Sequence, residues 1–205
     1  MSLPPGEFVA AIGQLHRETV SRWHTCELDN PYEGLLGTVC QQHQFNFLLW
    51  HEEDVARSSD VSDARIAAVK RAIDGYNQQR NDWIERIDEA LINALAEQRV
   101  QPAEDARLNT ETPGSAIDRL SIMALRIYHL QEQLDRPDVD DQHLAKVRQR
   151  IERCQLQQAD LSQSLAELLE DLLAGRKLLK VYRQMKMYND PTLNPYLYAG
   201  KQQAA

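Results

Sequence analysis

The residues best suited to chemistry are acidic side chains and one histidine on two predicted helices. His51 and Asp54 are three residues apart, so one helical turn brings both to the same face. Glu85 and Asp88 have the same spacing on the next predicted helix. Pairs of this kind on neighbouring helices hold divalent ions inside bundles, and carboxylates suit Mg²⁺ or Mn²⁺. The four residues are therefore candidate metal ligands, and the ion could polarise a phosphoryl group or activate a water molecule.

A simpler interpretation of the same residues is a solvated acidic surface. Acidic side chains are common on helices and form ion pairs with residues three or four positions away. In that case His51 hydrogen-bonds Asp54 or a backbone carbonyl. We favour this interpretation, because the sequence does not show that the two pairs face each other.

A second candidate site lies at residues 112–115, which open a predicted helix. Thr112 is a typical N-cap, and Pro113 suits the first helical position. Free N–H groups and the helix dipole favour an anion at such a terminus. Gly114 would let a phosphate approach the backbone, and Ser115 could donate a hydrogen bond. Capping alone explains Thr112 and Pro113, but it leaves the glycine unexplained, since glycine costs stability relative to alanine there.

Charged residues also interrupt helix faces that are otherwise apolar. Arg80 falls within the apolar stripe of one helix, and Asp118, Arg119 and Arg126 interrupt another. Buried charges must be paired or bound to a ligand. These charges and the 112–115 turn therefore make up a candidate phosphate site: Arg80, Thr112, Gly114, Ser115, Asp118, Arg119 and Arg126. The alternative is an internal ion-pair network that fixes the register of the helices, for example Arg80 or Arg119 with Asp118 or Glu111.

Helical periodicity dominates the elements that carry these residues, and no strand-like alternation persists. We predict an all-α fold with no sheet, in which residues 1–205 form a single bundle of about five helices. The expected ranges are 7–26, 32–57, 63–99, 113–130 and 140–188. The three-four spacing of the last helix is coiled-coil-like, so this helix could pack within the chain or pair with a second copy. Residues 188–205 are expected to form a non-helical tail that packs back on the bundle.

Composition narrows the class of protein. A net charge of −8 argues against general binding to nucleic acid or anionic membranes. No apolar run is long enough to span a membrane, and the first residues lack the features of a signal peptide, so we expect a cytoplasmic protein. Three widely spaced cysteines fit reduced, buried thiols.

Several stretches resemble a bacterial family of unknown function, DUF4254. They are residues 46–57, Ile73-Asp74, residues 77–82, Ile87-Asp88, residues 111–129 and residues 188–191. The resemblance implies a helical protein often encoded near glycosyltransferases of envelope-polysaccharide assembly, with no established activity. A weaker similarity links the Glu85-x-x-Asp88 pair to all-helical nucleotide pyrophosphatases, but Ala56 and Arg57 stand where those proteins carry a further acid.

Two functions remain open on these grounds. The first is binding, hydrolysis or transfer of a phosphorylated sugar or nucleotide in envelope-glycan metabolism. The second is a non-catalytic helical adaptor that docks on a glycosyltransferase or forms a homodimer. An open cleft lined by the charged residues would favour the first, and a closed network of paired charges would favour the second.

Overall fold

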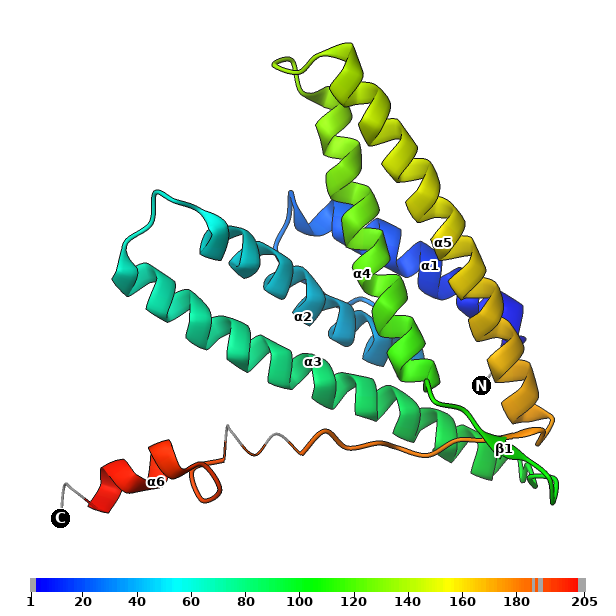
Figure 1. The fold of residues 1–205 in the computed structure, drawn as a ribbon. Coiled ribbons are helices and arrows are strands. Elements are labelled where there is room, and N and C mark those ends of the chain that lie inside the picture. Colours follow the sequence, from blue (N-terminus) through cyan, green and yellow to red (C-terminus); the bar gives the residue numbers. More distant parts are fainter. Residues whose placement is uncertain (1–2, 186, 188–189, 203–205) are drawn as a thin grey trace.

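A computed structural model describes residues 3–185, 187 and 190–202, and it confirms the predicted all-α fold (Figure 1). Five long helices form the body. They are α1 (Pro5–Trp23), α2 (Gly34–Arg57), α3 (Asp63–Glu97), α4 (Pro113–Glu132) and α5 (Asp141–Leu173). A short 3₁₀ turn, η1 (Gln133–Asp135), follows α4. No helix in the described part is both long and apolar enough to cross a membrane.

The body consists of two helical hairpins and one helix that contacts both. Figure 1 shows α2 running antiparallel to α3, and α4 running antiparallel to α5. Helix α1 packs against α2, α4 and α5, so the core lies where the two hairpins meet. Fully buried side chains from all five helices fill it, among them Ile12, Leu15, Val39, Ile87, Ile117, Leu125 and Leu165.

Three helices begin at side chains that act as N-caps, among them the predicted cap Thr112. The side chains of Ser62, Thr112 and Asp140 accept hydrogen bonds from the backbone N–H groups of Arg65, Ser115 and His143, respectively. Each of these bonds satisfies an N–H group that the helix itself leaves free.

The last long helix is shorter than predicted. It ends at Leu173 instead of continuing to residue 188, because Gly175 adopts a left-handed conformation with φ 70°. The Arg176 N–H then bonds the Asp171 carbonyl, and the Gly175 N–H bonds the Leu172 carbonyl. These two bonds form a Schellman motif, which terminates a helix.

The chain after α5 corrects two further predictions. Strands β1 (Arg107–Leu108) and β2 (Lys177–Leu178) form a two-residue parallel pair, although no sheet is expected. The segment after β2 runs beside α3, where Arg183 forms an ion pair with Glu85 (Figure 1). Pro195–Gln202 then form helix α6 where a non-helical tail is expected. Tyr188 and Asn189, at the predicted end of the long helix, lie outside the described residues.

Candidate metal centre

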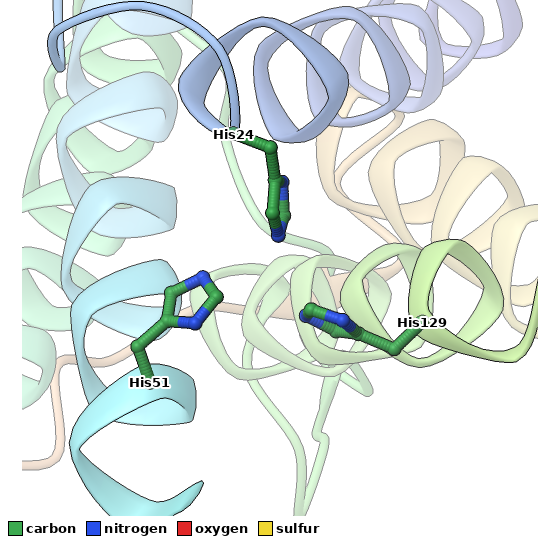
Figure 2. A group of neighbouring side chains, drawn as sticks. All are labelled: His24, His51 and His129. Atoms are coloured by element: carbon green, nitrogen blue, oxygen red, sulfur yellow. The ribbon is translucent and has the colours of Figure 1, made fainter. Parts of the chain in front are cut away.

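Three histidines from different helices converge on one point. His24 follows the last residue of α1, His51 lies in α2 and His129 lies in α4 (Figure 2). One ring nitrogen from each residue lies within 4.8 Å of the other two. In the described part of the chain, this is the only group of three or more His, Cys, Asp or Glu side chains arranged in this way.

Hydrogen bonds orient two of the rings. The Nδ1 atom of His24 lies 2.6 Å from the Val20 carbonyl oxygen, and Nδ1 of His129 lies 2.7 Å from a carboxylate oxygen of Glu132. A carbonyl oxygen can only accept, so Nδ1 of His24 must carry the proton, and the same tautomer suits His129 beside the carboxylate. Neutral rings of this tautomer present the lone pair of Nε2.

Among the residues that the structure describes, the Nε2 atoms of the three rings have no hydrogen-bond partner. Each of these atoms is buried. Buried polar atoms nearly always have a partner, so three such atoms at one point need an explanation. A metal ion held by the three rings would supply one, because metal-bound histidines characteristically donate their other ring N–H to a carbonyl or carboxylate.

Aromatic side chains hold the rings in place. Tyr128 stacks on His24 with centroids 4.2 Å apart, and Trp50 stacks on His129 at 4.9 Å and 8°. Phe47 meets His24 and His51 edge-on at 5.0 and 4.4 Å. Packing of this kind restricts ring rotation and pre-organises the three nitrogens.

The surroundings of His51 favour its neutral form. Burial lowers the pKa of His51 below its usual value, and repulsion from His24 and His129 lowers it further. His51 is therefore neutral near pH 7, as metal coordination requires. Three imidazoles suit Zn²⁺ and neighbouring transition metals, whereas Mg²⁺ and Mn²⁺ prefer oxygen.

The structure does not bring the four predicted metal ligands together. His51 belongs to the histidine group, whereas Asp54 is exposed and lies 3.6 Å from Arg57. Glu85 pairs with Arg183 at 2.8 Å and also accepts a hydrogen bond from the backbone N–H of Gln184.

The fourth predicted ligand, Asp88, lies at the N-terminus of α4. Its Oδ1 atom accepts a hydrogen bond of 2.7 Å from the Gly114 N–H, so a carboxylate of the chain itself occupies this anion-favouring position. A Cβ on Gly114 would lie 2.6 Å from the Ile84 carbonyl oxygen, which explains the glycine. Thr112 Oγ1 accepts from the Ser115 N–H, and the hydroxyl oxygens of the two residues lie 3.1 Å apart. Burial raises the pKa of Asp88 to about 6, although the bonds from Thr112 and Gly114 act in the opposite direction.

Arg80 and Asp118 form a partly buried ion pair. Arg80 donates to both carboxylate oxygens, with Nε–Oδ1 2.7 Å and Nη2–Oδ2 2.5 Å. Gln42 and Asn46 of α2 donate to the same carboxylate at 2.6 and 2.9 Å. The network continues through Ser121, whose hydroxyl meets Asn46 at 2.8 Å and His43 at 2.6 Å. This pairing matches the internal network that the sequence leaves open as an alternative.

Arg119 and Arg126 lie on a groove of about 610 Å³ between α4 and α5. Arg119 donates to both carboxylate oxygens of Glu111 at 2.9 Å. Arg126 is exposed and has no ion-pair partner among the described residues. Both arginines belong to the predicted phosphate site, and Asp160 lies on the same groove.

Sequence reasoning misses His24 and His129. Their separation of 105 residues carries no spacing signal, and only the packing of α1 against α4 brings them together. The spacing of His129 and Glu132, three residues apart on one helix, is the one readable hint, since it is typical of an oriented histidine.

The fold and the site together define an all-helical protein with a three-histidine group between three of its helices. Residues 36–181 match the family described as "Protein of unknown function (DUF4254)", and the chain belongs to this family. No curated protein and no solved structure matches the chain. His51 and His129 lie within the matched residues, whereas His24 lies before them.

Proposed function

We propose that this protein binds a divalent transition metal, with Zn²⁺ the best candidate, through His24, His51 and His129. The observation that carries the proposal is the convergence of three imidazoles, each with a buried Nε2 atom that lacks a partner among the described residues. Tetrahedral zinc with nitrogen ligands about 2.0 Å away places those nitrogens about 3.3 Å apart. The ligand nitrogens, which lie within 4.8 Å of one another, therefore need to approach by no more than about 1.5 Å to hold the ion.

Three protein ligands leave one tetrahedral position for water or substrate. Structural zinc sites have four protein ligands, whereas catalytic sites have three and keep one position open. A zinc ion held by three neutral imidazoles keeps its full positive charge, so it lowers the pKa of bound water and polarises an oxygen of a bound substrate. The geometry therefore supports metal-dependent hydrolysis as the reaction class.

The test is metal binding by the purified full chain after removal of metal with a chelator. We expect one Zn²⁺ per chain by calorimetry, and visible absorption typical of tetrahedral coordination when Co²⁺ replaces it. Zinc at a hundredfold excess over its Kd adds about 2.7 kcal/mol to the free energy of unfolding. His24→Ala, His51→Ala and His129→Ala should each abolish binding.

His143→Ala is the matched control, because His143 also has a buried Nε2 without a partner in the described part but lies on α5, outside the group. Circular dichroism of the metal-free variants separates lost ligation from lost folding. Zinc binding of equal affinity in a folded His24→Ala variant would rule out the proposed centre.

A second candidate function is binding of a phosphorylated sugar or nucleotide in the groove between α4 and α5. Arg126 favours it, since this guanidinium lines the groove without an ion-pair partner among the described residues. A role in envelope-glycan metabolism rests on the family resemblance alone. Titration with UDP-glucose tests the groove: Arg126→Gln should weaken binding at least tenfold, and unchanged binding would exclude Arg126.

The adaptor alternative rests on a different observation. The Arg80–Asp118 pair is closed by Gln42 and Asn46, as expected for a structural network. If no metal and no phosphorylated ligand binds, light scattering for a homodimer and capture by a co-encoded glycosyltransferase become the appropriate experiments.

A further inference from the structure

A cleft of about 420 Å³ lies between α1 and α5, and the metal proposal does not use it. This volume is within the range of small-molecule sites in proteins. Small residues line much of it, including Gly6, Ala10, Gly13, Ala159 and Ala166, so side chains leave the space open.

His16 of α1 is a buried residue in the wall of this cleft. The side chain is 1% exposed, and neither ring nitrogen has a hydrogen-bond partner among the described residues. Its ring packs against the His43 ring, with centroids 4.5 Å apart and planes tilted by 41°. Burial lowers the pKa of His16 well below its usual value, so the ring is neutral and offers one N–H donor and one acceptor.

The remaining polar groups of the cleft are mostly neutral donors and acceptors. Gln155, Gln158 and Ser162 supply amide and hydroxyl groups from α5. Arg17 is the one charged residue on the cleft; its guanidinium lies across Gly13, and it has no acidic partner among the described residues. Neutral donors and acceptors match ligand hydroxyls, and a single free guanidinium matches one anionic group.

We propose that the cleft between α1 and α5 binds a small polyhydroxylated anion, a sugar acid or a sugar phosphate. His16, Gln158 and Ser162 bond its hydroxyls, and Arg17 binds its anionic group. This site is separate from the groove between α4 and α5 and needs no metal.

Calorimetry on the full chain with chelator present tests the proposal with four probes: gluconate, glucose 6-phosphate, glucose and inorganic phosphate. Gluconate or glucose 6-phosphate should bind at least tenfold more tightly than glucose or phosphate, and the better of the two distinguishes a carboxylate ligand from a phosphate ligand. Arg17→Gln should weaken that binding at least tenfold. Arg126→Gln, which removes a guanidinium from the other groove, should leave it unchanged.

Imidazole NMR signals of the unsubstituted chain provide a second readout. Once through-bond experiments assign the His16 signals, the better probe should shift them while leaving those of His143 in place. Equal binding of phosphate alone, an unchanged Kd in Arg17→Gln, or unmoved His16 signals would overturn the proposal. None of these outcomes bears on zinc binding, because the chelator is present throughout.

Discussion

Replacing Arg80 by methionine should destabilise the protein by about 3–5 kcal/mol. The Asp118 side chain is 7% exposed and accepts bonds from Arg80, Gln42 and Asn46. Without Arg80, the buried Asp118 carboxylate keeps hydrogen bonds only from the neutral amides of Gln42 and Asn46. Removing one partner of a buried ion pair costs about 3–5 kcal/mol. The Arg80 side chain is 26% exposed, so water can reach the vacated space, and we expect the lower half of that range.

Urea denaturation of Arg80→Met, Asp118→Asn and the double variant measures this contribution. The double variant should be more stable than the sum of the two single losses implies, by at least about 1 kcal/mol, because each single change leaves its partner unpaired. Arg119→Met is the matched control: it breaks the exposed pair with Glu111 and should cost less than about 1 kcal/mol.

The result also decides between two interpretations of Arg80. A loss no larger than that of Arg119→Met, together with additive single effects, would refute the reasoning that the pair holds the helices together. Arg80 would then be available to a ligand. A large coupled loss favours the structural network.

Three further changes have defined outcomes. Burial raises the pKa of Asp88 from 3.8 to about 6, so between these pH values the folded state retains a proton that the unfolded state releases. The free energy of unfolding should therefore fall by about 2–3 kcal/mol as pH rises from about 4 to 6. Urea denaturation of Asp88→Asn should not show this loss. Gly114→Ala should lower stability by about 1–3 kcal/mol because its Cβ meets the Ile84 carbonyl, whereas thermal melts of Gly75→Ala, which has open space, should show a gain of up to about 1 kcal/mol. Glu132→Gln should weaken zinc binding about 10- to 100-fold in calorimetry by loosening His129; unchanged affinity would mean that Glu132 does not orient the ring.

Features set by neighbouring residues are predictable from this sequence. The all-α class follows from apolar periodicity, and the N-cap Thr112 follows from the preference of threonine side chains for free helical N–H groups. The cap contact spans three residues, so no tertiary information is needed.

The end of α5 shows how a periodic pattern can mislead. Apolar residues continue at helical spacing beyond Gly175, but the left-handed conformation of this glycine ends the helix and its carbonyl accepts from the Ala103 N–H. The glycine itself was a readable stop signal. The β1–β2 pairing could not be predicted from the sequence, because the two strands are about 70 residues apart.

The candidate site depends almost entirely on packing. Charges on apolar faces indicate where Arg80 and Asp118 lie, but their separation of 38 residues hides that they pair. Likewise, Gly114 suggests a phosphate cradle in the sequence, whereas in the structure the α3 backbone and Asp88 lie against it. Long-range pairing of this kind has no signature in a single sequence.

The polar residues discussed above fall into two groups, according to whether a hydrogen-bond or ion-pair partner within the chain satisfies them. Arg80, Asp88 and Asp118 each have a partner within the chain, whereas the buried atoms without one, among the described residues, are mainly imidazole nitrogens. Helices α2 and α4 connect the two groups. Asp118 and Ser121 tie α4 to Gln42, His43 and Asn46 of α2, and the same two helices carry His129 and His51. The closed network therefore sets the spacing of two of the proposed metal ligands, so the Arg80–Asp118 pair would support the proposed site without touching the ion.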